Sequence, residues 1–198
     1  LLTIKKDIET KRLISEKTTS TYQSQFSQLG MQINSAGSID QWKEIYGKLV
    51  YWERELDNSE TGGMDDVLRL QKGEANKEFA RFIRKHYPDW FSGREQEVPM
   101  MSPSLFRQKV FPLLNESQVV VVIVDNLRYD QWKIIEESIS DLFHTESEEM
   151  FLSILPTATQ YARNAMFAGV MPLQIQEKYP RMWKDEADEG GKNTFEEE

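Results

Sequence analysis

The sequence predicts a three-helix bundle followed by the opening part of an α/β domain with a parallel sheet. Before residue 92, apolar residues recur at helical spacing in three stretches that short turn-forming segments separate. Residues 119–124 form an uninterrupted β-branched run, which is typical of a strand buried on both faces of a parallel sheet. Helix-like and strand-like segments then alternate, as they do in α/β domains. We therefore expect a bundle over 1–92, a linker and helix over 93–117, and the start of the α/β domain over 118–198.

The middle helix of the expected bundle has the clearest pattern. Ser38 and Gln41 form a capping box, and the apolar residues that follow fall on one helix face. These residues are Trp42, Ile45, Tyr46, Leu49, Val50 and Leu56. A segment containing Asn58 and two glycines ends the helix.

The two flanking helices are less regular. The third has an apolar stripe between Val67 and Ile83, and we expect Pro88 to end it near His86 and Tyr87. The first has a polar middle over residues 18–25, which could face solvent or a partner chain, and the sequence favours solvent.

The expected α/β part begins after a segment without periodicity. Ser102 as a cap and Pro103 at the first helical position predict a helix that runs to about Leu114. The 119–124 strand is followed by an expected helix over 129–140, a second strand over 150–155, and a helix over 159–168 that Gly169 and Pro172 end.

Composition excludes several classes of protein. The chain has 198 residues, of which 39% are apolar and 29% charged, as in an ordinary globular protein. No apolar run approaches the roughly 18 residues that a membrane helix needs. A formal charge of −9 argues against duplex DNA as a partner, because phosphate binding depends on clustered Lys and Arg.

The chain contains no cysteine and begins without methionine, in a segment that resembles the last turns of a helix. Without cysteines or a secretory pattern, we expect a cytoplasmic protein. The abrupt start leads us to expect a piece of a longer chain.

In open α/β sheets, ligands bind beyond the carboxyl ends of the strands, so the residues that follow 119–124 are candidates for a site. Asp125 comes directly after this strand, and a carboxylate held there is a suitable metal ligand. Asp125 could instead cap the next helix, with Asp130 pairing to Lys133 or Arg128.

The second expected strand leads into Pro156, Thr157, Ala158 and Thr159. A hydroxyl at the start of a helix lies near unpaired backbone N–H groups, which stabilise an alkoxide and an incoming phosphate. Either threonine could instead be a simple N-cap. An Asp after one strand and a Thr after the next are together what a metal-activated threonine nucleophile requires, because its hydroxyl needs a base or a metal to become reactive.

The runs VVVVIVDNLRYDQW and LPTATQYARNAMFAGVMP resemble the start of a PglZ domain, a branch of the alkaline phosphatase superfamily. The resemblance implies a partial alkaline-phosphatase-like parallel sheet, with Asp125 as a zinc ligand. It also implies that Thr159 is both the nucleophile and a metal ligand, with Thr157 the less favoured choice, and that the complete site holds two zinc ions.

The bundle upstream makes the chain similar to PorX-type response regulators. That resemblance implies a receiver domain before the bundle, dimerisation on phosphorylation, and a zinc phosphodiesterase effector domain. It further implies a sensor histidine kinase and a sigma factor as partners, and control of type IX secretion. The alternative is a non-catalytic module that transmits dimerisation and docks the sigma factor.

The sequence departs from the superfamily pattern in two respects. Related phosphodiesterases carry an Asn three residues after the nucleophile, where this chain has Ala162, followed by Arg163 and Asn164, so no role is assigned to these two residues. The later Asp and His ligands have no counterparts, because His86 and His144 both precede Thr159 and are expected to be structural or surface residues. This chain alone is therefore expected to be inactive.

Overall fold

The computed structural model describes residues 2–57, 64–92, 94–95 and 97–184, with side chains described from Lys17 onward except at 18 and 19. The chain divides into two compact units. The first comprises Leu1–Gln96 and Asp125–Glu146, and the second Glu97–Val124 and Ser147–Glu198. Each unit is described by itself.

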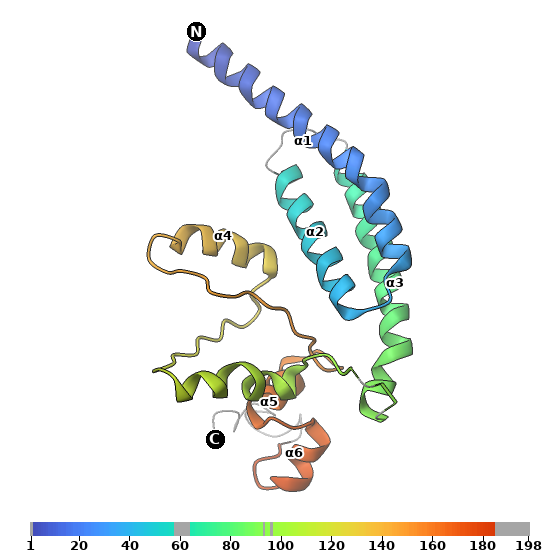
Figure 1. Cartoon of the computed structure of the whole chain (residues 1–198), viewed down its shortest axis with the longest axis vertical. Helices are drawn as coiled ribbons and strands as arrows, with labels where there is room; N and C mark the ends of the chain where they lie inside the picture. The colour runs from blue at the N-terminus through green and yellow to red at the C-terminus, as the bar shows by residue number, and fades with distance from the viewer. Residues whose placement is uncertain (1, 58–63, 93, 96, 185–198) are drawn as a thin grey trace. The chain divides into compact units, whose positions relative to one another are not determined.

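The first unit contains the predicted bundle. Its helices are α1 (Leu2–Ser35), α2 (Ile39–Asp57) and α3 (Asp65–Ser92), and each packs against the other two (Figure 1). The three predicted helices are thus confirmed. The buried side chains of the bundle include Leu29, Ile33, Trp42, Ile45, Leu49, Val50, Trp52, Leu56, Leu68, Ala75, Phe82 and Trp90.

The sequence led us to expect that the polar middle of α1 faces solvent, but part of it is buried. Tyr22 is completely buried, and with Leu29 and Ile33 it forms a narrow stripe along the helix. Residues 20, 21 and 23–25 around it are exposed. The prediction for 18–25 was therefore wrong at Tyr22, because one large aromatic side chain is enough to hold two turns of an otherwise polar helix against the core.

The start of α2 is formed as predicted. The Ser38 hydroxyl accepts a hydrogen bond from Gln41 N (3.3 Å), and the Gln41 side chain accepts one from Ser38 N (3.2 Å). The predicted buried face is confirmed except at Tyr46, which is about half exposed, while Trp52 is buried instead. Trp52 is buried because it faces α1, where its ring lies 5.1 Å from that of Tyr22.

Helix α3 continues past Pro88, so the prediction that it ends near His86 was wrong. Proline removes one backbone donor and disfavours the preceding turn. The side chain of Trp90 is nevertheless buried, and its ring lies 6.3 Å from that of Phe82 and 5.9 Å from that of Tyr87. These aromatic contacts hold the last turn in place after the proline.

A fourth helix of the first unit, α4 (Tyr129–Ile139), packs against α2. It agrees with the helix predicted over 129–140. The second unit contains the short helical turns η1 (Ser102–Ser104), η2 (Phe106–Val110) and η3 (Phe111–Asn115), followed by α5 (Thr159–Ala168) and α6 (Pro172–Lys178). The α5 bounds match the prediction.

The helix predicted from Ser102 to Leu114 is broken into those three turns. η1 and η3 have 3₁₀ geometry, and η2 is a π turn. Pro112 lacks a backbone donor in the interior of the predicted helix, so a regular α-helical ladder cannot run through the whole segment.

The predicted parallel sheet is not formed among the described residues. Within the described ranges residues 119–124 have no strand partner, and Val120 is 88% exposed. One parallel bridge joins Met101 to Leu152, so part of the predicted 150–155 strand has a parallel neighbour, though not the one expected. A strand needs a neighbour for its backbone donors and acceptors, and the described residues supply one only at this bridge.

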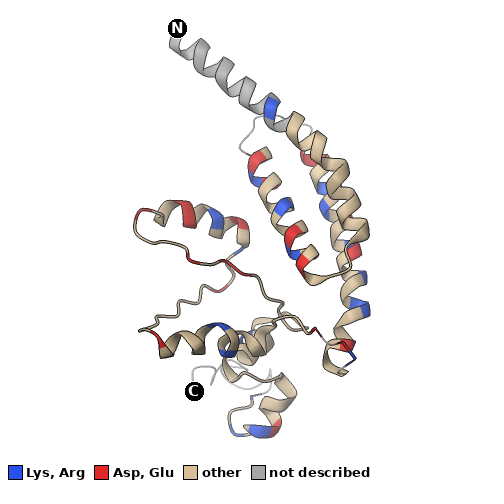
Figure 2. Ribbon diagram, in the orientation of Figure 1, with Lys and Arg blue, Asp and Glu red and all other residues tan. Residues whose placement is uncertain are grey.

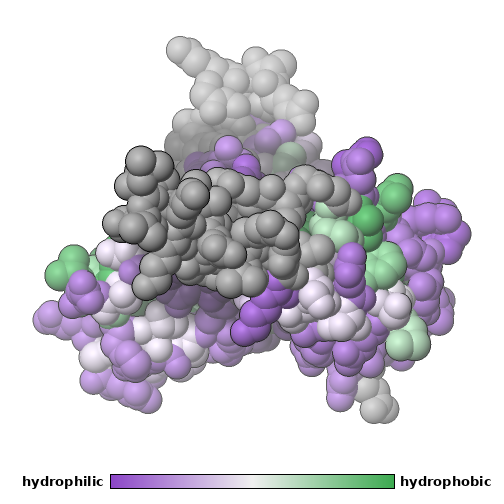
Figure 3. Space-filling view, turned by 90° about the horizontal axis from the view of Figure 1, so that it is seen from above, coloured by the Kyte–Doolittle hydropathy of each residue, from purple (hydrophilic) through white to green (hydrophobic). Residues whose placement is uncertain are grey.

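None of the helices in the described part of the chain combines the length and apolar character needed to cross a bilayer. In the view of Figure 3, hydrophilic side chains predominate among the described residues, and apolar ones form separate small groups.

Candidate functional site

The loop that contains Asp125 turns the chain into α4. Asp125 is exposed, and its Oδ1 accepts a hydrogen bond from the backbone N–H of Asn126, 2.9 Å away. Asn126 has a left-handed backbone with φ of 58°, a conformation that Asn adopts more readily than most residues. Arg128 occupies the N-cap position of α4, so the interpretation of Asp125 as the cap of this helix was wrong.

Arg128 and Asp130 form a two-bond ion pair at the start of α4. Arg128 Nε donates to Asp130 Oδ1 (2.9 Å), and Arg128 Nη2 donates to Asp130 Oδ2 (2.6 Å). The guanidinium holds the pKa of the Asp130 carboxyl below its usual range, and the carboxylate raises the pKa of Arg128. Of the two partners predicted for Asp130, Arg128 is confirmed, while Lys133 pairs with Glu136 at 2.9 Å.

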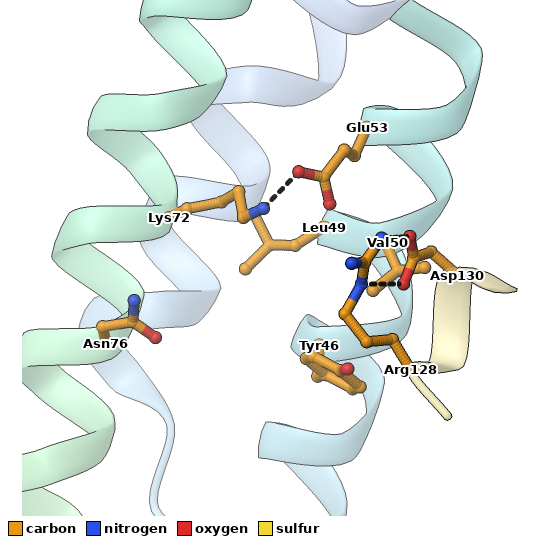
Figure 4. Close-up of a pocket in the computed structure, with 8 residues that line it drawn as sticks. All are labelled: Tyr46, Leu49, Val50, Glu53, Lys72, Asn76, Arg128 and Asp130. Atoms are coloured by element: carbon orange, nitrogen blue, oxygen red, sulfur yellow. Dashed lines mark hydrogen bonds and ion pairs between the residues drawn. The ribbon is translucent and has the colours of Figure 1, made fainter. Parts of the chain in front are cut away.

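A cavity of about 240 Å³ lies beside this ion pair, within the first unit (Figure 4). It contains a second ion pair, Lys72 with Glu53. Burial raises the pKa of the Tyr46 hydroxyl, and the Asp130 carboxylate raises it further. The lining residues are Tyr46, Leu49, Val50, Glu53, Lys72, Asn76, Arg128 and Asp130.

Thr159 is the first residue of α5 and is half-buried. The N-cap is Ala158, whose carbonyl accepts hydrogen bonds from Tyr161 N (2.9 Å) and Ala162 N (3.0 Å). Neither Thr157 nor Thr159 is therefore the N-cap, and the alternative that one of them is a simple N-cap was wrong. Thr159 lies in the first turn of a ten-residue helix, where backbone N–H groups and the helix dipole favour negative charge.

Contacts within the second unit hold α5 in place. The rings of Phe106 and Phe167 stack with centroids 5.5 Å apart, and Arg107 Nη2 donates to the carbonyl of Gly169 at 3.2 Å. In the segment before α5, Ile154 N donates to the hydroxyl of the buried Ser102 at 3.3 Å. The C-terminal end of α5 and the segment that precedes the helix are thus both held by contacts within the second unit.

Asp125 belongs to the first unit and Thr159 to the second, so the structure defines the local geometry of each and not a joint site. A carboxylate and a threonine hydroxyl are both oxygen donors that zinc accepts. Among the described residues, no three His, Cys, Asp or Glu side chains are grouped as a metal site requires. The donors present fit part of a zinc site and do not complete one.

Neither histidine belongs to a metal-ligand group in the described part of the chain. His86 stacks on Phe82 with ring centroids 4.4 Å apart, and its Nδ1 lies 2.5 Å from Glu95 Oε1. That contact lowers the pKa of the Glu95 carboxyl. His144 is exposed. Both environments agree with the expectation that the two histidines are surface or structural residues.

Sequence reasoning missed the cavity residues Glu53 and Lys72. Their ion pair joins α2 to α3 across 19 positions, and nothing in the spacing of the sequence indicates it. Arg163 and Asn164, to which the sequence assigned no role, lie half-buried on α5.

Two family models match the chain. Residues 12–91 match the PorX response regulator linker domain, and residues 105–198 match the BREX system PglZ alkaline phosphatase-like domain. The first match covers the bundle, and the second includes Asp125 and Thr159. A search of curated proteins found no match.

Proposed function

Because the chain belongs to the PorX-type response regulators, carrying their linker domain and a PglZ domain, we propose that its PglZ domain is a zinc-dependent phosphodiesterase. The observation that carries this proposal is the match of an alkaline phosphatase-like domain over residues 105–198. Both candidate residues lie in the matched range, and Thr159 has the helix-start position that suits a nucleophile.

The Thr159 hydroxyl attacks the phosphorus of a phosphodiester. A bond forms between Thr159 Oγ1 and phosphorus, the bond from phosphorus to the leaving oxygen breaks, the hydroxyl proton is released, and the leaving alkoxide takes up a proton. Water then attacks the phosphorus of the resulting threonine phosphodiester, the bond between phosphorus and Thr159 Oγ1 breaks, Thr159 regains its proton, and a phosphomonoester leaves. Backbone N–H groups in the first turn of α5 stabilise the charge that develops on the phosphoryl oxygens.

Asp125 and Thr159 are the residues that would hold zinc. When bound, a pair of zinc ions supplies Lewis acidity and lowers the pKa of the nucleophile. The two residues are too few for two ions, so the remaining Asp and His ligands of the proposed site belong to further residues of a longer protein.

The proposed regulator is cytoplasmic and acts in a two-component system. A sensor histidine kinase phosphorylates a receiver domain that precedes the bundle, the regulator dimerises, and it acts with a sigma factor to control type IX secretion. The PorX linker match over residues 12–91 supports this part of the proposal.

Thr159→Val in the intact regulator tests the enzymatic role. Valine keeps the shape of threonine and removes the nucleophilic oxygen, so hydrolysis of bis-p-nitrophenyl phosphate should fall by more than about 10³-fold. Thr157→Val is the matched control, since Thr157 is exposed and precedes the helix, and it should hydrolyse the ester at nearly the wild-type rate. A Thr159→Val protein as fast as wild type would disprove the mechanism.

The second candidate function is a non-catalytic signalling module. The packing of α4, which lies in the PglZ match, on α2, which lies in the linker match, favours it, because such contact suits the transmission of a signal. Elemental analysis of the intact regulator separates the two functions, since a pure docking module retains no stoichiometric zinc.

A further inference from the structure

Two contacts join α4 to the bundle helix α2. The rings of Tyr46 and Tyr129 lie 5.8 Å apart at an angle of 35°, and Arg54 Nη2 donates to Glu137 Oε1 at 2.6 Å. In both pairs the partners are 83 residues apart in the sequence, so the two contacts follow each other in the same order on both helices, which cross at a wide angle (Figure 1). The contacts are two turns apart on each helix, about 12 Å, and together they fix both the position and the direction of α4.

In the contact between Arg54 and Glu137, the Arg54 side chain is largely buried. The Arg54 side chain is only 24% exposed, although Glu137 is 70% exposed. The hydrogen bond that Arg54 donates to the Glu137 carboxylate raises the pKa of Arg54. Figure 2 shows that both helices carry charges of both signs, so their contact depends on which charge meets which.

A short and constrained segment connects α4 to Asp125. Only Asn126, Leu127 and Arg128 lie between Asp125 and the first residue of α4. Asn126 is in the left-handed region, and the ion pair between Arg128 and Asp130 ties the segment to the first turn of the helix. A segment this short cannot absorb a displacement of α4, so the position of α4 determines that of the Asp125 carboxylate.

The segment also borders the cavity described above. Arg128 and Asp130 form one wall, and Tyr46, Glu53 and Lys72 belong to the bundle (Figure 4). The cavity leaves space into which the ion pair could shift if the contact between α2 and α4 were lost.

We propose that the bundle positions Asp125 for zinc binding, with Tyr46 and Arg54 of α2 as positioning residues that hold α4 and, through it, the segment that carries the carboxylate. This inference rests on the proposed function, since it takes Asp125 as a zinc ligand. It adds that the state of the bundle controls the affinity of the site. Residues that orient a metal ligand without touching the metal typically change metal affinity or activity by about 10- to 100-fold.

The contact itself is tested in this 198-residue chain without any metal. The chain has no cysteine, so an introduced pair reacts alone. Arg54 and Glu137 meet in an ion pair, so cysteines at these positions lie within reach of each other. Arg54→Cys with Glu137→Cys should be joined rapidly by a bifunctional maleimide. Asp40→Cys with Glu137→Cys is the control, because Asp40 lies about 21 Å from Arg54 along α2, and it should remain unjoined. Equal cross-linking of the two pairs would overturn the contact.

The effect on the site is tested in the intact regulator by competition for Zn²⁺ with a chromogenic chelator. Tyr46→Ala combined with Arg54→Glu should weaken Zn²⁺ binding by about 10- to 100-fold. Tyr51→Ala is the control, since Tyr51 is exposed on another side of α2, and it should bind Zn²⁺ as wild type does. Arg54→Glu alone places two carboxylates together, and adding Glu137→Arg restores an ion pair of reversed polarity, so the double variant should recover much of the affinity lost by Arg54→Glu.

The outcomes distinguish the positioning role of the bundle from the proposed zinc-dependent function. Tight Zn²⁺ binding that none of these substitutions changes would overturn the positioning role and leave the proposed function intact. Failure of the wild-type regulator to bind Zn²⁺ would overturn the proposed function and the role of Asp125 with it. The reversed-charge pair keeps the result informative if the Tyr46→Ala variant unfolds, because it rebuilds the contact without removing a side chain.

Discussion

The hydroxyl of Tyr22 on α1 donates a hydrogen bond to the side-chain oxygen of Gln71 on α3 at 2.9 Å, and both side chains are buried. Gln71 Nε2 in turn donates to the carbonyl of Phe26 at 3.0 Å. The Tyr22 ring packs 5.1 Å from that of Trp52 on α2. One tyrosine thus joins all three helices of the bundle, and its polar end is satisfied inside the core.

Tyr22→Phe should destabilise the bundle by about 1–2 kcal/mol, because it removes a donor and leaves a buried acceptor on Gln71 without it. Urea denaturation followed by circular dichroism measures the change. Tyr51→Phe is the matched control: Tyr51 lies on α2 with its side chain about half exposed, and its substitution should change the unfolding free energy by less than about 0.5 kcal/mol. Equal losses in the two variants would contradict the role given to the buried hydrogen bond.

The same residue should make the bundle sensitive to alkali. Burial raises the pKa of Tyr22 to about 12 from its ordinary value of 10.0. Because the folded-state pKa is the higher one, the contribution of Tyr22 to stability is fully present below pH 10 and is lost as pH rises from 10 to about 12. Denaturation midpoints measured across this range should fall less steeply in Tyr22→Phe than in wild type. Identical slopes would show that Tyr22 ionises as readily in the folded chain as in the unfolded one.

The helical part of the fold was accessible from the sequence where the signals are local. The capping box of Ser38 and Gln41 involves residues three apart, and it is formed as predicted. The burial of Tyr22 was not accessible, because its partners Trp52 and Gln71 lie on other helices. Likewise, Pro88 is an unfavourable residue inside a helix, and only the tertiary contacts of Trp90 explain why α3 continues past it.

The sheet and the site depended on partners that local pattern cannot specify. The run 119–124 has the composition of a buried strand, yet the described residues offer it no neighbour. Asp125 and Thr159 could be identified as candidates, because Asp125 follows a strand-like run and Thr159 begins a helix. The pair of Arg54 and Glu137, 83 residues apart, has no local signature and could be found only in the folded chain.

Ile33→Ala should destabilise the bundle by about 2–4 kcal/mol, because the Ile33 side chain is only 1% exposed and its loss leaves a cavity between packed helices. Met31 lies two positions earlier on the same helix and is 65% exposed, so Met31→Ala should change the unfolding free energy by less than about 0.5 kcal/mol. Thermal unfolding of the two variants compares the two faces of α1 directly. A Met31→Ala loss as large as that of Ile33→Ala would mean that α1 is packed on a different face.

Two glycines should respond in opposite directions to the same added methyl group. Gly169 follows α5 with φ of +66°, and a Cβ there would meet its nearest neighbours at 3.7 and 3.8 Å, which is ordinary contact. The penalty for Gly169→Ala is therefore one of backbone conformation, about 1–2 kcal/mol. Gly47 lies inside α2, and a Cβ there would meet nothing within 4 Å. Gly47→Ala should stabilise the bundle by about 0.5–1 kcal/mol, because alanine loses less conformational entropy in a helix. Denaturant titration of both variants tests the two signs, and a stabilising Gly169→Ala would show that the end of α5 is not left-handed.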